Sequence, residues 1–254
     1  HAYALGRERI EDAMEMVRIA AGLDDAAFEE RPRMYTNINS SSPLKHDWPM
    51  LDGAMRLARR GQAVFVAPFT LAGAMAPVTL AGAIAQQTAE ALSAIALLQY
   101  MRPGAPVVYG AFTSNVDMQS GAPAFGTPEY IRAMQMSGQM ARRYRLPWRG
   151  SNANASNAPD AQAAWESSNS LFGVMSGQAS MVFHGAGWLE GGLTSSLEKF
   201  VIDCELIQQW MYYHAHPVST EEDDLAVEAI REVGPHGHFL GAEHTRARYR
   251  DAFY

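Results

Sequence analysis

Short continuous apolar runs alternate along the chain with longer segments whose apolar residues recur at helical spacing. A short apolar run between turn residues is typical of a buried parallel strand. Such runs predict strands at residues 34–37, 63–68, 106–110, 146–150 and 180–185. Helical spacing bounded by capping residues, Gly or Pro predicts helices at residues 6–21, 47–60, 79–101, 127–144, 160–178, 195–213 and 220–233.

This alternation of strands and helices predicts an α/β fold. A doubly wound sheet and a (β/α)8 barrel both fit it, but neither Gly-x-Gly-x-x-Gly nor Gly-x-x-x-x-Gly-Lys-Ser/Thr follows a predicted strand, which disfavours a nucleotide-binding fold. Five strand–helix units are too few for a closed eight-stranded barrel, and the chain opens at His1 without an initiator Met. We therefore expect residues 1–254 to be the C-terminal part of a larger (β/α)8 TIM-type barrel, with residues 218–254 as a helical or tail extension.

Charge and composition narrow the classes of partner. The chain has 254 residues and a net charge of −7, and its basic clusters are short, so it lacks the basic stripe that would neutralise nucleic-acid phosphates. The single cysteine, Cys204, excludes a disulfide framework and favours a reducing compartment, so we expect a cytoplasmic protein. The long apolar segment at residues 79–101 contains Gln86, Gln87 and Glu90, which argues against a membrane span.

Two predicted loops carry more chemistry than ordinary turns do. Residues 110–118 and 149–157 each follow a predicted strand and are rich in amides and hydroxyls. In repeated strand–helix folds the loops at the carboxyl ends of the strands build the active site. The sequence therefore predicts an enzyme that binds a small polar ligand.

Several phrases occur in an order and spacing that resemble one family over nearly the whole chain. They are Ala74-Met-Ala-Pro-Val-Thr-Leu-Ala-Gly82, Ala89-Glu90-Ala-Leu, Pro103-Gly-Ala-Pro-Val-Val-Tyr-Gly110, Asp160-Ala-Gln162 with Glu166, Gly185-Ala-Gly187, Ser196-Leu-Glu-Lys-Phe-Val-Ile-Asp203, and Gly237-His-Phe-Leu240 with His244-Thr245. Together they resemble the trimethylamine:corrinoid methyltransferase family, which includes glycine betaine methyltransferases.

The resemblance implies a (β/α)8 enzyme that moves a methyl group from a methylated amine to the cobalt of a corrinoid. The corrinoid is carried by a separate partner protein, so we expect no tightly bound cofactor in this chain. Archetypal trimethylamine enzymes carry pyrrolysine at a strand end, and none occurs here. The chain is therefore similar to the non-pyrrolysine branch, whose substrates are quaternary amines such as glycine betaine, and trimethylamine itself becomes doubtful. A role of this kind in methylamine metabolism needs no nucleic acid or membrane, and self-association is left open.

A quaternary ammonium has no N–H to donate and is bound by aromatic faces and nearby carboxylates or dipoles. Phe112, Asn115 and Asp117 are the candidates for a cage wall, a polar contact and a countercharge; the alternative is that Asn and Asp simply form a turn. Phe69 and Thr70 occupy the same place after the preceding strand. Tyr35 and Asn37, at the end of the first strand, are weaker candidates.

The loop after the fourth strand offers Arg149, Asn152 and Asn154 as substrate-binding residues. Arg149 suits the carboxylate of a betaine, because a guanidinium binds a carboxylate through two parallel hydrogen bonds. The alternative is a structural ion pair between Arg149 and Asp160 or Glu166.

Two further residues are candidates for the reaction itself. Glu166 lies one helical turn from Gln162, so the pair can face the mouth of the barrel and orient the substrate or the docked corrinoid; structural use with Asp160 as the helix cap is the alternative. His184 ends the fifth strand and can contact the substrate or the corrinoid, or be a satisfied core histidine. With Asp117, these are the predicted catalytic residues.

Other classes of protein stay open. The histidines at 214, 216, 236, 238 and 244 raise a zinc hypothesis, but the chain has one cysteine and no His-Glu-x-x-His, so we predict no metal site and treat them as surface or tail residues. The remaining alternatives to a methyltransferase are a metal-dependent hydrolase or lyase on a barrel, and an amine-binding module without turnover.

Overall fold

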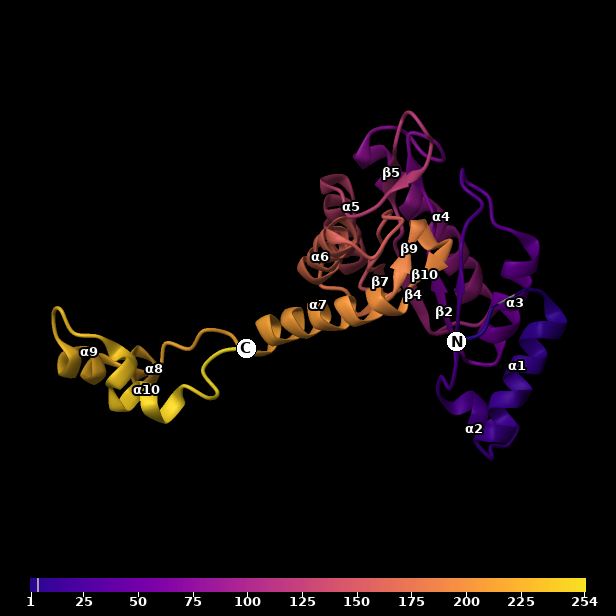
Figure 1. Cartoon of the computed structure of the whole chain (residues 1–254). Coiled ribbons are helices and arrows are strands. Elements are labelled where there is room, and N and C mark those ends of the chain that lie inside the picture. The colour runs from indigo at the N-terminus through magenta and orange to yellow at the C-terminus, as the bar shows by residue number, and fades with distance from the viewer. Residues whose placement is uncertain (4) are drawn as a thin grey trace. The chain divides into compact units, whose positions relative to one another are not determined.

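The computed structural model describes residues 1–3 and 5–254, and it divides into two compact units, His1–Cys204 and Glu205–Tyr254 (Figure 1). The first unit contains the sheets, and α7 (Leu197–Ala215) begins in it and continues into the second. None of the helices described has both the length and the apolar character needed to cross a bilayer.

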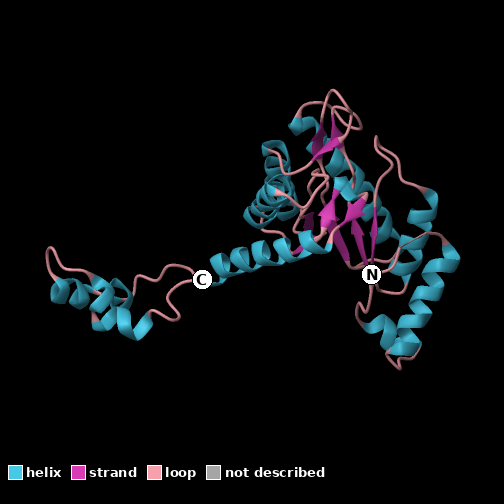
Figure 2. Ribbon diagram, in the orientation of Figure 1, coloured by secondary structure: helices cyan, strands magenta, loops and turns pink. Residues whose placement is uncertain are grey.

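A curled sheet of five parallel strands organises the first unit. The strands are β1 (Tyr35–Ile38), β2 (Ala63–Val66), β4 (Val107–Gly110), β7 (Trp148–Ser151) and β8 (Met181–Phe183), and they pair in chain order (Figure 2). All five were predicted from the apolar runs, so the prediction of an α/β protein is confirmed. A doubly wound sheet reverses its strand order at a switch point. No such reversal occurs in this sheet, so its winding is that of part of a barrel.

Helices cover one face of this sheet, with α3 packing on β1 and β2, α4 on β2 and β4, and α5 and α6 on β7. Three of these helices begin at a side-chain cap: Asp24, Thr127 and Asp160 each accept a hydrogen bond from a backbone N–H in the first turn of the following helix. The helices of the first unit are α1 (Arg7–Ala20), α2 (Asp25–Glu30), α3 (Trp48–Arg59), α4 (Leu80–Met101), α5 (Pro128–Arg143), α6 (Ala161–Ser176) and the start of α7, with a 3₁₀ turn at Glu190–Gly192. The sequence predicted all of these α-helices except the short α2.

The two faces of the strands differ in chemistry because successive side chains point to opposite faces. Tyr109 faces the helices, where its hydroxyl accepts from Gln87 at 2.8 Å and is hydrogen-bonded to Thr88. On the opposite face Tyr35, Phe65 and Phe183 form a triangle of rings with centroids 4.9 to 5.9 Å apart. The second face is thus aromatic and leads to the carboxyl ends of the strands.

Two small sheets were missed by the sequence analysis. One contains β3 (Leu71–Ala72), β5 (Ser114–Val116) and β6 (Pro123–Ala124); the other is the hairpin of β9 (Trp188–Leu189) and β10 (Thr194–Ser195). Residues 110–118 were predicted as a loop, and that prediction is wrong for β5. Strands of two or three residues are too short to show a period of two, so the sequence has no signal for them.

The second unit contains short helices. We predicted one helix over residues 220–233, but the structure has α8 (Glu222–Leu225) and α9 (Val227–Val233), separated at Ala226, which adopts a left-handed conformation with φ of 50°. A 3₁₀ turn (Phe239–Gly241) and α10 (Glu243–Arg248) follow.

The close contact between α5 and α6 yields a test of the packing. A Cβ on Gly138 would lie 2.0 Å from the carbonyl oxygen of Gly177, so the two helix segments have no room for a side chain here. Gly138→Ala in a free helix would stabilise by about 1 kcal/mol. In this protein we expect it to lower the free energy of unfolding by about 1–3 kcal/mol through overpacking. Urea unfolding measures this, with Gln139→Ala, an exposed neighbour on α5, as the control; stabilisation by both substitutions would contradict the packing.

Candidate functional site

A cavity of about 360 Å³ opens at the carboxyl ends of the five parallel strands. Its position is the one expected for a binding site in this kind of fold. Its walls come from the chain terminus and from residues on or just after strands β1, β2, β4, β7 and β8. They are His1, Tyr3, Asn37, Asn39, Ser40, Phe69, Phe112, Arg149, Phe183, His184 and Trp188.

Arg149 is the only positive side chain of this wall apart from the histidines, and it is 3% exposed. Its guanidinium lies 4.3 Å from the ring centroid of Phe183 and 5.5 Å from that of Phe112. Within residues 1–3 and 5–254, its Nε and Nη1 atoms have no hydrogen-bond partner and no carboxylate forms an ion pair with it. Burial lowers the pKa of Arg149 to about 10, so the group is still a cation at neutral pH.

The alternative structural role of Arg149, an ion pair with Asp160 or Glu166, is therefore not found. Asp160 instead caps α6 by accepting from the backbone N–H of Ala163 at 3.1 Å. The carboxylate of Glu166 accepts from the backbone N–H groups of Ala155 and Ser156, at 2.7 and 2.9 Å. Both acids are used elsewhere, which leaves the guanidinium facing the cavity without a countercharge.

His184 lies next to Arg149 in the same wall. Its ring centroid is 4.0 Å from that of Trp188 and 5.5 Å from that of Phe112, and its Nδ1 has no partner among the described residues. Burial, and then the positive charge of Arg149, lower the pKa of His184 to about 3. His184 is therefore a neutral imidazole at physiological pH, and it adds no second charge to the cavity. Its backbone has φ of 55°, an uncommon conformation for a residue with a side chain.

Aromatic rings form most of the remaining wall. Phe69 and Phe112 lie 5.1 Å apart between ring centroids, and Phe112 lies 6.1 Å from Trp188 in an edge-on arrangement. Ring faces attract a cation that cannot donate hydrogen bonds, by about 0.5–2 kcal/mol each. The cavity thus combines one fixed positive charge with a surface suited to a quaternary ammonium.

The end of β1 supplies the polar wall. Asn37 Oδ1 has no partner among the described residues, whereas the amide of Asn39 donates to the carbonyl of Ala67 at 2.6 Å. The following loop is fastened by Glu90 of α4, whose carboxylate accepts from the hydroxyls of Ser40 and Ser42 and from the backbone N–H of Leu44. Burial raises the pKa of Glu90, but these hydrogen bonds outweigh it and hold the pKa below its usual value.

The structure brings Phe69, Phe112, Arg149 and His184 together out of the residues predicted for the site. The weaker candidate Asn37 also lines the cavity. The polar candidates from the later strands are hydrogen-bonded within the surrounding loops and are not part of the wall. Thr70 is hydrogen-bonded to Thr113, Asn115 accepts from Thr127, Asn152 donates to the carbonyl of Gly185, and Asn154 donates to Ser167 and to the carbonyl of Trp188.

Asp117 and Glu166 also lie outside the wall of the cavity. Asp117 is exposed and accepts from Ser120 Oγ and from the backbone N–H groups of Gln119 and Ser120, which lower its pKa. Its contacts are those of a turn residue, the alternative that the sequence had left open. The catalytic roles of Asp117 and Glu166 stay predictions, and only His184 of the three faces the cavity.

Sequence reasoning missed several wall residues. Phe183 lies in the predicted strand at residues 180–185 and was given no role in a site, and Trp188, four residues after His184, was not considered. Asn39 and Ser40 were seen only as a polar loop. His1 and Tyr3 carried no signal, because the contacts of a terminal segment are set by the tertiary fold.

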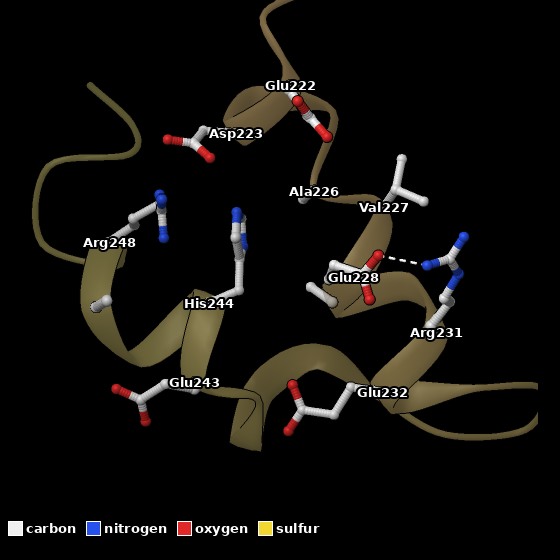
Figure 3. A pocket seen from close by; sticks show the side chains of 12 residues that line it. Glu222, Asp223, Ala226, Val227, Glu228, Arg231, Glu232, Glu243, His244 and Arg248 are labelled. Atoms are coloured by element: carbon white, nitrogen blue, oxygen red, sulfur yellow. Dashed lines mark hydrogen bonds and ion pairs between the residues drawn. The ribbon is translucent and has the colours of Figure 1, made fainter.

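A larger hollow of about 700 Å³ lies in the second unit, among α8, α9 and α10 (Figure 3). Ala229 is the one lining residue that is buried; the charged side chains around the hollow are largely exposed and some pair with one another, as Arg231 does with Glu228. Exposed and paired charges bind small ligands weakly. Over the part of the chain that the structure describes, no three His, Cys, Asp or Glu side chains are grouped as they would be around a metal ion.

The fold and cavity define a class: an α/β protein whose sequentially paired parallel strands carry a cationic, aromatic cavity at their carboxyl ends. The chain matches the trimethylamine methyltransferase (MTTB) family over residues 1–254, and it belongs to this family.

Curated relatives within this family differ in the methylated amine that their names give. The chain is 39% identical over 252 residues to a glycine betaine methyltransferase of Desulfitobacterium hafniense (strain Y51), which covers 99% of this chain and 52% of the relative. It is 33% identical to a proline betaine:corrinoid methyltransferase of Eubacterium limosum, over 87% of this chain and 46% of the relative. It is 31% identical to a trimethylamine methyltransferase of Desulfitobacterium hafniense (strain DSM 10664 / DCB-2), over 96% of this chain and 49% of the relative. The chain thus spans about half the length of these relatives.

The depressed pKa of His184 makes stability depend on pH. The unfolded chain binds a proton at this residue below about pH 6.5, whereas the folded protein does so only near pH 3, so acidification through this window favours unfolding. At pH 5 we expect the effect to be about 1–2 kcal/mol. His184→Asn should flatten the fall in unfolding free energy between pH 7 and pH 4, measured by urea titration at each pH. His216→Asn, at an exposed histidine, is the control, and equal slopes for His184→Asn and the unsubstituted protein would contradict the buried neutral imidazole.

Proposed function

We propose that the protein moves an N-methyl group from a carboxylated quaternary amine, of the glycine betaine type, to the cobalt of a corrinoid carried by a partner protein. We further propose that the strands of this chain form part of a (β/α)8 barrel in the intact protein. Family membership and the names of the relatives support the reaction, and the continuous strand order supports the barrel. The unpaired guanidinium of Arg149 in an aromatic cavity is the observation that carries the choice of substrate.

Electrostatics favour a zwitterion in this cavity over a simple cation. Two like charges about 5 Å apart repel by about 3 kcal/mol at an effective dielectric constant near 20, and a carboxylate in contact with the guanidinium gains a comparable amount. Trimethylammonium or choline would bring a second cation beside Arg149 and leave its N–H groups unpaired. A betaine satisfies these N–H groups with its carboxylate and places its ammonium against ring faces.

The residues of this chain have to bind and orient the substrate, and they need not move a proton, because the methyl group of a quaternary amine is already electrophilic. Arg149 would hold the carboxylate and so fix the direction in which the ammonium points. Phe69, Phe112 and Trp188 would surround the ammonium and exclude water, and neutral His184 would do so without adding charge. The corrinoid of the partner would supply a strongly nucleophilic cobalt as the methyl acceptor, and alignment of the methyl group accounts for much of the remaining catalysis.

Binding without turnover is the second candidate, because the same cavity would hold a betaine whether or not methyl transfer follows. The two are separated by assaying both steps on the intact protein: calorimetry for binding, and the spectrum of methylcobalamin formed from cob(I)alamin for transfer. Binding of glycine betaine with no methylcobalamin would favour the binding module, whereas no binding of glycine betaine, proline betaine or carnitine would sink both.

Replacing Arg149 tests the carboxylate contact directly. Arg149→Met keeps an unbranched apolar stem and removes the charge. Loss of a charged hydrogen bond costs about 1.5–3 kcal/mol, so we expect the Kd for glycine betaine to rise by about 10- to 150-fold. Binding of trimethylamine should stay the same or improve, because the repulsive charge is gone. Calorimetry compares both ligands with Arg132→Met, an exposed arginine on α5, as the control.

Equal weakening of both ligands would show that Arg149 supports the fold of the cavity and not the carboxylate. Arg149→Lys is expected to restore only part of the affinity, since an ammonium cannot form two parallel hydrogen bonds to a carboxylate.

A further inference from the structure

Trp188 is held at two points by a single residue. The side-chain amide of Asn154 donates to the carbonyl oxygen of Trp188 at 2.7 Å, and the indole N–H of Trp188 donates to the carbonyl oxygen of Asn154 at 3.2 Å. Asn154 is fully buried and follows β7, whereas Trp188 follows β8. The position of the indole in the cavity wall therefore depends on where Asn154 is held.

Asn154 is in turn tied to a buried ion pair. Its amide also donates to the hydroxyl of Ser167 on α6 at 3.2 Å, and the same hydroxyl accepts from the ammonium of Lys199 on α7 at 2.6 Å. Lys199 pairs with Asp203, one helical turn further along α7, and both side chains are fully buried.

The hydrogen bonds then return to their starting point. Asp203 Oδ2 accepts from the backbone N–H of Gly187 at 2.8 Å, and Gly187 directly precedes Trp188. We call this closed circuit the Lys199 ring: Trp188, Asn154, Ser167, Lys199, Asp203 and Gly187. It joins the loops after β7 and β8 to two helices.

The energetics of the ring argue against a purely stabilising role. Taking two charges out of water costs free energy that their attraction only partly returns, and well-packed apolar residues are often as stabilising as a buried ion pair. Burial lowers the pKa of Lys199, which reflects this cost. The hydrogen bond and charge of Asp203 act in the opposite direction. An apolar pair could not replace the hydrogen bonds of this ion pair, because it has neither an acceptor for the N–H of Gly187 nor a donor to Ser167.

The segment from His184 to Trp188, which the Lys199 ring holds, needs contacts that fix its backbone conformation. His184 has φ of 55° and Gly187 has φ of 85°, so two of its residues are in the left-handed region. A left-handed conformation in a residue with a side chain costs of order 1–3 kcal/mol and persists only where the surroundings fix it. His184 and Trp188, whose rings are in tilted contact in the cavity wall, lie at either end of this strained turn.

We propose that Lys199 and Asp203 are positioning residues, which act through the Lys199 ring to hold Trp188 against His184 in the wall of the ligand cavity. The consequence for ligand affinity rests on the function proposed above; the consequence for the position of Trp188 does not. Neither charged side chain lines the cavity.

The position of Trp188 is measured without any ligand. Labelling the intact protein with 5-fluorotryptophan gives a ¹⁹F resonance for each tryptophan, five of which lie in this chain, and Trp188→Phe assigns the one of interest. Ser167→Ala removes the link between Asn154 and Lys199 without changing charge. Lys199→Met/Asp203→Asn removes both charges together and keeps an oxygen for Gly187, so no lone charge is left buried. Ser137→Ala, a buried serine on α5 outside the ring, is the matched control.

We expect Ser167→Ala and the double variant to shift or split the Trp188 resonance while that of Trp148, a buried residue of β7 whose indole N–H donates to the carbonyls of Gly177 and Gln178, stays in place. The control should leave both unchanged. An unchanged Trp188 resonance in Ser167→Ala would overturn the proposal. So would an equal change at Trp148, which would show general loosening of the fold; if the double variant fails to fold, Ser167→Ala decides.

Ligand binding gives the second arm. Ser167→Ala should raise the Kd for glycine betaine by about fivefold to tenfold, which corresponds to about 1–1.4 kcal/mol. In the Trp188→Phe background the same substitution should have almost no effect, because its influence passes through the indole. If the effects of Ser167→Ala and Trp188→Phe on the Kd simply multiply, the two residues act independently and the proposal is overturned. If the unsubstituted protein binds no betaine, the proposed function fails, and the ¹⁹F result still decides whether the ring positions Trp188.

Discussion

The buried positive charge of Arg149 is the constraint around which the site is organised. Arg149 stacks on Phe183 and Phe112 but has no anionic partner in the part of the chain that the structure describes. An isolated buried charge is costly unless something pairs with it. Aromatic faces return part of this cost, and the neutral state of His184 avoids adding to it. The cavity is thus prepared for an anion before any ligand arrives, and the aromatic wall beside it suits the opposite charge.

A cavity with a fixed, unpaired cation needs surrounding loops that keep their conformation and do not rearrange around the charge. Three of the five loops are tied down by a carboxylate on a helix: Glu90 of α4 holds the loop after β1, Glu166 of α6 the loop after β7, and Asp203 of α7 the loop after β8. In every case the carboxylate accepts from backbone N–H groups. These acids are structural in their contacts, and together they fix the mouth of the sheet on which Arg149 is displayed.

The sequence was sufficient for the scaffold and only partly so for the site. Apolar runs located the five parallel strands because burial of both faces leaves a local signature, and Arg149 and His184 were selected because both belong to predicted strand ends. Trp188 escaped because its place depends on hydrogen bonds to Asn154, a residue 34 positions away. The polar residues Asn152 and Asn154 have hydrogen-bond partners in neighbouring loops, which the sequence could not reveal, and their substrate-binding roles stay predictions. The type of each side chain can be read from the sequence, but its hydrogen-bond partner depends on the tertiary fold.

The carboxylates that hold the mouth loops recognise amide groups, which every residue except proline possesses. Loop side chains without hydrogen bonds of their own can therefore change without loss of these backbone contacts, whereas Ser40, Ser42 and Asn154 also hold the loops through their side chains. Such a division separates the part of the molecule that must stay constant from the part that can diversify. The relatives described above are named for glycine betaine, proline betaine and trimethylamine, amines that differ in shape and charge.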